Sequence, residues 1–206
     1  MNDSMRRRPS GRTVLTGLVL LASTSLAAPV DAAAPKETIQ GLIAKVGDVL
    51  KDPALQGPAK TAERRARVGR IIHEAFDFQR MSPAALGAPW GALSAEQRLE
   101  FTRLFGDRFA QSYSLLVLRF LGERTTTYAG EAVMGEEAVV LTRLESPADG
   151  TLPVEYRLTA RDDGWGVADV VVDGISLTAN YRTQFSRILR TGTYETLLGR
   201  MRRAGE

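Results

Sequence analysis

The sequence predicts an α+β domain in which helices come first, a four-stranded antiparallel curved sheet follows, and helices close the chain. Up to residue 121 the apolar residues recur at helical spacing, and from residue 125 to 172 they follow the two-residue period of strands. The stretch Trp165–Phe185 then joins the last strand to a closing helix through the turn pair Asp173-Gly174.

The first 32 residues have the pattern of a cleaved secretory signal peptide. Four arginines precede an apolar run, residues 14–26, that is short for a membrane span. Val30 and Ala32 suit the positions before a cleavage site, and an alternative cut follows Ala27. An N-terminal membrane anchor is the other interpretation. The chain has no cysteine, so it is not a lipoprotein with a lipidated cysteine. The signal peptide predicts the periplasm or the exterior as the destination.

Residues 33–206 are predicted to form a single domain. Four of the 27 Lys and Arg and two of the 24 Asp and Glu lie in the first 32 residues, which leaves 23 basic and 22 acidic residues and a net charge of +1. The excess of positive charge therefore comes largely from the signal, and it gives little support to nucleic-acid binding. A domain of this size folds without disulfides, consistent with the absence of cysteine.

Two amphipathic helices are predicted before residue 76. The segment 35–52 carries apolar residues at helical spacing, and Pro53 ends it. The segment 61–75 has an apolar side and an opposite side rich in arginine. We interpret the arginines as a solvated face, and a docking surface for a partner is the alternative.

A short helical segment and a long helix follow. In the short segment Ser82 is expected to cap, Pro83 to occupy the first turn, and Gly87 to end the helix. Ser94 and Gln97 form a capping box at the start of the long helix. Toward the end of that helix apolar residues surround the axis almost completely, which predicts burial on most sides.

The predicted strands are 125–134, 138–144, 154–161 and 165–172. Short turns separate them, so the sheet should be an antiparallel meander. The third strand alternates clearly, with Val154, Tyr156 and Leu158 on one face. Ser176 is expected to cap the closing helix, and Tyr194–Arg203 to form a final short helix.

The residue types that carry most enzyme and metal chemistry are scarce. His73 is the only histidine and cysteine is absent, so a zinc or copper site of imidazole and thiolate ligands is nearly excluded. Ser176 lies in D-G-I-S-L rather than in G-x-S-x-G, and no glycine-rich phosphate motif occurs. We therefore expect no catalytic residues, no metal and no cofactor. The alternative is an enzyme acting on a lipid or steroid through Asp169 or Tyr156 in a cavity.

Three stretches carry a family resemblance. They are Phe76-Asp77-Phe78, the segment Trp90–Phe101 that opens the long helix, and Trp165–Phe185, which reads W-x-V-x-D-V-x-V-D-G-I-S-L-x-x-N-Y-R-x-Q-F. Together with the secretory signal they resemble the MlaC family of periplasmic phospholipid-binding proteins, also called toluene-tolerance auxiliary proteins. The closing motif is long and fairly specific, whereas the other two are weak alone.

The resemblance implies a fold similar to NTF2- or cystatin-like domains, with a cavity for acyl chains between sheet and helices. It implies a non-enzymatic phospholipid carrier, with bound phospholipid as cargo, that maintains outer-membrane lipid asymmetry. The implied partners are an outer-membrane lipoprotein complex and an inner-membrane ABC transporter, and we expect a monomer. A carrier of hopanoids or other lipids and an adaptor with a filled core remain open.

We expect residues on the apolar faces of the predicted helices and strands to line that cavity. These lipid-binding candidates are Phe78, Met81, Phe105, Phe109, Leu116, Leu141, Tyr156, Leu158, Val170 and Val172. Periodicity alone does not separate the residues of a filled core from those that line a cavity.

Overall fold

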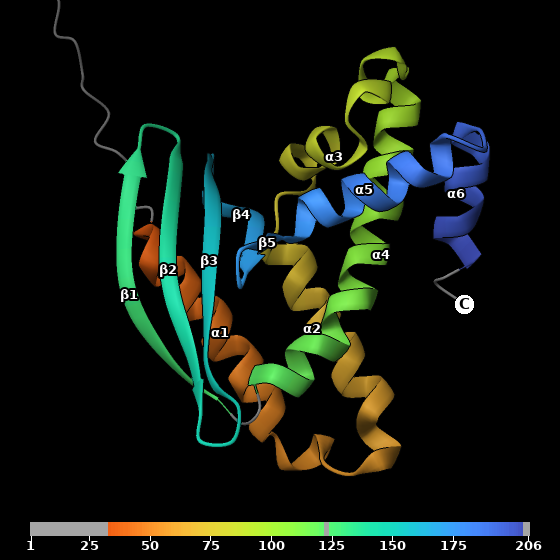
Figure 1. Ribbon diagram of the computed structural model, residues 1–206. Coiled ribbons are helices and arrows are strands. Elements are labelled where there is room, and N and C mark those ends of the chain that lie inside the picture. The colour runs from red at the N-terminus through yellow and green to blue at the C-terminus, as the bar shows by residue number, and fades with distance from the viewer. Residues whose placement is uncertain (1–32, 122–123, 204–206) are drawn as a thin grey trace, which may run out of the picture. The chain divides into compact units, whose positions relative to one another are not determined.

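The computed structural model describes residues 33–121 and 124–203 (Figure 1). The predicted signal peptide, residues 1–32, lies outside the described residues. The helices are α1 (Pro35–Lys51), α2 (Thr61–Ala75), α3 (Phe78–Leu86), α4 (Ala95–Leu121), α5 (Leu177–Leu189) and α6 (Tyr194–Arg203), with short 3₁₀ helices η1 (Pro53–Leu55), η2 (Pro58–Lys60) and η3 (Ala88–Ala92). The strands are β1 (Thr125–Met134), β2 (Glu137–Ser146), β3 (Gly150–Arg161), β4 (Gly164–Val172) and β5 (Ile175–Ser176). The predicted α+β order is confirmed.

The sheet is an antiparallel meander in the order β1-β2-β3-β4-β5. The prediction of four strands is wrong, because Val171 pairs with Ser176 and Val172 with Ile175 to add a fifth. The turn residues Asp173 and Gly174 have φ of 49° and 78°, and positive φ at both positions matches the twist of a two-residue hairpin. Two residues are too few to show an alternating pattern, so periodicity does not detect this strand.

Side-chain caps start two of the helices where the sequence predicts them. The Gln97 N–H donates to Ser94 Oγ at 3.2 Å, and the Ser94 N–H donates to Gln97 Oε1 at 2.9 Å. This reciprocal pair is the predicted capping box of α4. Ser176 Oγ accepts the Ala179 N–H at 3.0 Å at the start of α5.

The predicted cap of α3 is wrong, because the helix begins four residues before Ser82. Asp77 is the cap, and its carboxylate accepts the Arg80 N–H at 3.0 Å. The Asp77 N–H donates to Val167 O at 2.8 Å, which fixes this residue against β4. Ser82 lies inside the helix and donates its hydroxyl to Phe78 O at 2.7 Å. Asp and Ser are equally suitable as helix caps, and the contact of Asp77 with β4 explains why the helix begins there rather than at Ser82.

An aromatic cluster fills the space between the first half of α4 and α5. Phe101, Phe105 and Phe109 are fully buried. Their rings pack on Tyr181 and Phe185 of α5 with centroids 5.1 to 5.8 Å apart. Tilted and edge-on arrangements of this kind add to the stabilisation from burial. The part of α4 that carries Phe101 and Phe105 therefore belongs to a filled core, and Phe109 lies at its edge.

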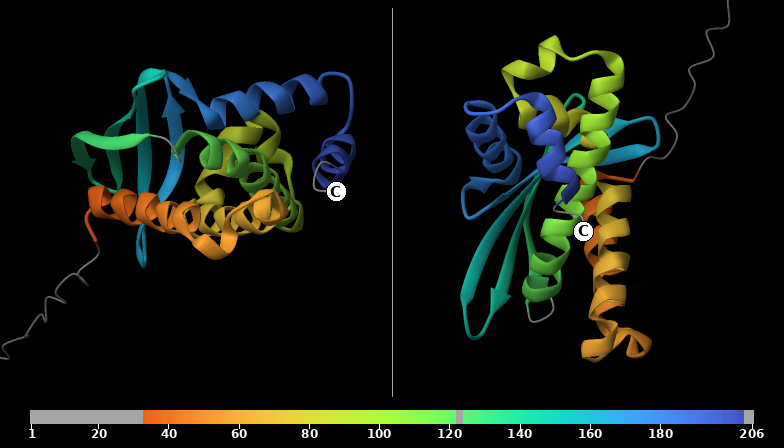
Figure 2. Two further views of the ribbon diagram at one scale, coloured as in Figure 1. Left: turned by 90° about the horizontal axis from the view of Figure 1, so that it is seen from below. Right: turned by 90° about the vertical axis from the view of Figure 1, so that its right-hand side faces the viewer.

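The last turns of α4 lie with α1 on the same face of the sheet (Figure 2, left) and are packed differently. Leu115, Leu116 and Phe120 remain 45%, 44% and 36% accessible. The predicted burial of α4 on most sides is therefore wrong here. Leu116 and Phe120 face a pocket instead of other side chains, and Leu115 does not line it.

The carboxylate of Asp169 joins β4 to the start of α5. Its Oδ1 accepts the backbone N–H groups of Val170 at 2.9 Å and Thr178 at 3.0 Å, and its Oδ2 accepts the Ser176 hydroxyl at 2.6 Å. The Arg157 guanidinium lies 3.9 Å from Oδ2. Asp169 is only 8% exposed, and a negative charge at a helix N-terminus is favourable. This one side chain therefore links the strand, the turn and the start of the helix.

We expect Asp169→Ala to lower the free energy of unfolding by about 2–4 kcal/mol, because hydrogen bonds to a buried carboxylate are strong and the substitution leaves their donors unpaired. Urea unfolding measures the change. The control is Asp162→Ala in the exposed turn between β3 and β4, where we expect a change within about 0.5 kcal/mol. Equal losses for the two variants would contradict the anchoring role.

Candidate functional site

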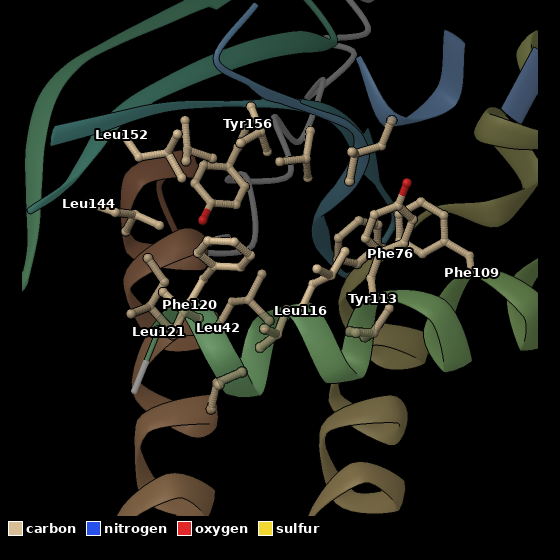
Figure 3. Close-up of a pocket in the computed structure, with 18 residues that line it drawn as sticks. Leu42, Phe76, Phe109, Tyr113, Leu116, Phe120, Leu121, Leu144, Leu152 and Tyr156 are labelled. Atoms are coloured by element: carbon tan, nitrogen blue, oxygen red, sulfur yellow. The ribbon is translucent and has the colours of Figure 1, made fainter. Parts of the chain in front are cut away.

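An apolar pocket of about 330 Å³ lies between the sheet and the helices (Figure 3). The sheet contributes Leu144, Leu152, Val154, Tyr156, Val170 and Val172. The helices and the residue after α2 contribute Leu42, Ile43, Val46, Ile72, Phe76, Phe109, Tyr113, Leu116, Val117, Phe120, Leu121 and Leu177. None of these lining residues is charged at neutral pH.

Strand alternation produces the sheet wall of the pocket. On β3, Val154 and Tyr156 point inward, as the sequence predicts, and both are buried. On β2 the inward set includes Thr142 and Leu144. The Thr142 hydroxyl donates to Val154 O at 3.1 Å, so the polar side chain is satisfied where it is buried.

The helix wall comes mainly from one stripe of α4. Phe109, Tyr113, Leu116 and Phe120 are separated by four, three and four residues, which places them on one face of the helix. α1 adds Leu42 and its neighbours from the side. The pocket is thus bounded by elements that are distant in sequence.

The polar groups of the lining are two tyrosine hydroxyls. Burial raises the pKa of Tyr113 to about 12, and burial raises the pKa of Tyr156 above its ordinary value. Figure 3 shows the Tyr156 hydroxyl directed toward Phe120. Both groups stay protonated at neutral pH, so the lining offers hydrogen bonds but no base and no charged nucleophile.

The structure brings five of the ten candidate residues together at the pocket: Phe109, Leu116, Tyr156, Val170 and Val172. It places Phe78, Met81, Phe105 and Leu158 in the filled core, where neighbouring side chains occupy the space around them. These four belong to correctly predicted apolar faces, but their faces pack against other elements.

Leu141 lies on the wrong face of the sheet for the lining. It is 41% exposed, whereas Val140 and Leu144 of the same strand are buried. The inward-facing residues of β2 alternate with the outward-facing ones and include the polar Thr142. This polar residue hides the inward face in the sequence, although Leu144 lies on the same face.

Sequence reasoning also missed the contribution of α1 and of several α4 side chains. Leu42, Ile43 and Val46 belong to an apolar stripe that the sequence displays, but nothing in the stripe shows that it faces a cavity. Tyr113 and Phe120 belong to the α4 stripe in the same way. The sequence shows which face of each helix is apolar, but it does not show how far apart the helices and the sheet lie.

Asp169 does not line the pocket, because its carboxylate is committed to the start of α5. The described residues contain no group of three or more His, Cys, Asp or Glu side chains placed to hold a metal ion. Within 33–121 and 124–203, no helix is both long enough and apolar enough to cross a bilayer.

Comparison with known proteins identifies the family. A sequence model of the MlaC protein family matches residues 40–203. The chain belongs to the MlaC family. The family predicted from the closing motif is therefore confirmed, and the match includes every residue that lines the pocket.

Two individual proteins resemble this MlaC-family chain. The toluene tolerance protein Ttg2D of Pseudomonas putida is 25% identical over 170 residues, which cover 82% of this chain and 79% of the relative. A phospholipid-binding protein from Ralstonia solanacearum, solved in complex with a phospholipid, superposes with a TM-score of 0.71 at 21% identity. That match covers 84% of this chain and 97% of the other, and it shows a shared fold.

Buried tyrosines give the MlaC-family chain a specific alkaline sensitivity. Above the ordinary tyrosine pKa of about 10 the unfolded chain releases a proton that folded Tyr156 retains, so the free energy of unfolding falls as pH rises. We expect a slope of up to about 1.4 kcal/mol per pH unit from this residue, and Tyr156→Phe should remove that contribution. Urea unfolding from about pH 9 to 11.5 measures it.

Tyr128→Phe is the control for this titration, because Tyr128 is less buried and its pKa is raised by burial alone. We expect a smaller change than for Tyr156→Phe. Parallel pH profiles for the native chain and Tyr156→Phe would contradict the assignment.

Proposed function

We propose that this protein is a periplasmic phospholipid carrier, and the uncharged apolar pocket is the observation that carries the proposal. Its lining is chemically suited to acyl chains and offers two hydroxyls near them. A charged head group has no partner inside this lining and would remain outside it. Family membership and the phospholipid bound to the Ralstonia relative support the same cargo.

The energy of transfer fits a carrier. Burial of each CH₂ group is worth about 0.8 kcal/mol, so a chain of roughly sixteen carbons represents on the order of 10 kcal/mol relative to water. A carrier must match much of the stabilisation that a bilayer provides, or the lipid stays in the membrane. It must not greatly exceed that stabilisation, or delivery fails. A pocket without a buried charged anchor meets both requirements.

An empty pocket is costly. At about 24 cal/mol per Å³ of cavity, a volume of about 330 Å³ corresponds to on the order of 8 kcal/mol if it were closed and dry. This is comparable with the whole stability of a domain, about 5–15 kcal/mol. Apolar walls do not hold ordered water. Apolar cargo would offset the part of this cost that applies to the partly open pocket. The pocket itself argues against an adaptor with a filled core.

The carrier shuttles phospholipid between an outer-membrane lipoprotein complex and an inner-membrane ABC transporter, and so maintains outer-membrane asymmetry. In this proposal the carrier is a monomer that needs no cofactor. Binding and release need no catalytic step, and the pocket lining holds no carboxylate, histidine or thiol that would supply one. The likeness to NTF2- and cystatin-like domains remains a prediction. So does export through cleavage near Ala32.

Native mass spectrometry of the protein purified from its own periplasm, followed by lipid extraction, tests the proposal. We expect phospholipid at about one molecule per chain, with its acyl chains in the apolar pocket. Extraction of a hopanoid or another lipid would change the cargo class. A bare polypeptide that also fails to load from liposomes would overturn the carrier function.

A pair of adjacent substitutions localises the cargo. Leu116→Trp places a larger side chain in the pocket, and we expect lipid occupancy to fall about tenfold, since a lost contact area worth about 1.4 kcal/mol suffices for that change. Leu115→Trp is the matched control, because Leu115 is equally accessible at 45% but does not line the pocket. Equal occupancy in the two variants would place the cargo elsewhere.

A further inference from the structure

A second concave surface lies on the other side of α4. It is a groove of about 840 Å³ bounded by α2, α4 and α6, which are seen together on one side of the domain (Figure 2, right). We call it the basic groove, because its walls carry Arg65, Arg70, Arg103, Arg108 and Arg202. The residues of α4 that line it differ from those that line the apolar pocket.

Positive charge is concentrated in the basic groove. Its five arginines face one acidic lining residue, Asp107, which gives a net charge of +4 with His73 neutral. Residues 33–206 carry +1 in total, so the remainder of this segment carries −3. If Glu100, which pairs with Arg202, is counted as well, the groove still carries +3. The charge is therefore asymmetric although the domain is nearly neutral.

Carboxylates compensate part of this charge, because Arg103 pairs with Asp107 and Arg202 with Glu100. Asp107 is shared, with its carboxylate 3.0 Å from Arg103 and 3.3 Å from His73. Arg65 donates to the carbonyl oxygen of Gln111 at 3.0 Å, which orients the guanidinium without neutralising it. Among the described residues Arg70 has no ion-pair partner within 4.0 Å, and it is exposed.

Mostly small apolar residues also line the groove, and we call them its floor. They are Ala62, Ala66 and Gly69, which share one face of α2, together with Ala110 of α4 and Met201 of α6. Small side chains leave room between basic walls. A chain segment fits into such a hollow, whereas a planar membrane surface would contact only its rims. Arginine binds carboxylates through paired N–H groups, which suits a segment rich in Asp or Glu.

We propose that the basic groove docks an acidic peptide segment, with apolar side chains directed at its floor, that belongs to a protein partner. The inference rests on the proposed function in one respect, because a carrier must dock to exchange cargo. The charge, the concave form and the apolar floor support this occupant independently of the cargo. Since α4 is the wall between groove and pocket, the segment binds next to the lipid without entering its pocket.

The test uses fluorescence anisotropy with a labelled peptide of Glu, Ala and Leu, and a second peptide with Gln in place of every Glu. We expect the acidic peptide to bind the native protein at least about tenfold more tightly than the Gln peptide. We also expect that binding to weaken between about 0.1 M and 1 M salt, where the screening length falls from roughly 10 Å to 3 Å.

Two matched double variants assign the site. Arg70→Glu with Arg103→Glu reverses two exposed charges in the groove, and we expect about tenfold weaker binding of the acidic peptide. Arg143→Glu with Arg187→Glu makes the same change of net charge at exposed positions outside it, and we expect less than about a twofold change. Equal weakening in both, or no binding of the acidic peptide, would overturn the proposal.

Two further results would also overturn it by identifying another occupant. One is binding to phosphatidylglycerol vesicles that the groove variant loses, without peptide binding. The other is self-association in light scattering that only the groove variant abolishes. Native mass spectrometry of the same samples separates this inference from the carrier function. If the protein retains lipid but does not bind the peptide, the groove proposal fails. If it binds the peptide but carries no lipid, the carrier proposal fails.

Discussion

The inner face of the sheet carries more apolar surface than the helices cover, and this constraint shapes the molecule. Along the first half of α4, Phe101 and Phe105 meet the aromatic side chains of α5 and fill the space as a normal core. Along the second half, Leu116 and Phe120 face a void. The residues that line this pocket are as apolar as those of the core, so the pocket is suited to an apolar molecule.

The polar groups of the interior are used for architecture rather than for chemistry. Asp169 is buried, and its oxygens accept from the backbone and hydroxyl donors at the start of α5. Thr142 satisfies its hydroxyl on a strand carbonyl. The pocket is left with Tyr113 and Tyr156, whose pKa values burial raises. A site of this kind favours binding by shape and solvent exclusion.

Most of the fold could be predicted because its determinants are local. The capping box at Ser94 and the cap at Ser176 stand in the structure as the sequence indicates. The failures were cases in which a distant contact decided the outcome. Asp77 became the cap of α3 because its backbone pairs with β4. The strand β5 follows from two positive φ angles rather than from a periodic pattern.

The site was only half predictable for the same reason. Phe105 and Leu116 belong to the same apolar stripe of α4, and only the tertiary packing makes one of them core and the other lining. Leu141 shows a second limit of sequence-based prediction. Because the buried Thr142 is polar, the alternation of β2 does not show which of its faces points inward. Composition and spacing identify an apolar face, but the volume beside that face is a property of how several elements meet.

Helix α4 has consequences for how this sequence can diverge. One face lines the pocket, another lines the basic groove, and Phe101 and Phe105 lie in the core. Residues three or four positions apart share a face, so each substitution in α4 must preserve the pocket lining, the groove lining or the core packing, depending on its face. Ser112, Leu115 and Arg119 line neither surface and are exposed or half-exposed. Substitutions should be tolerated best at positions of this kind.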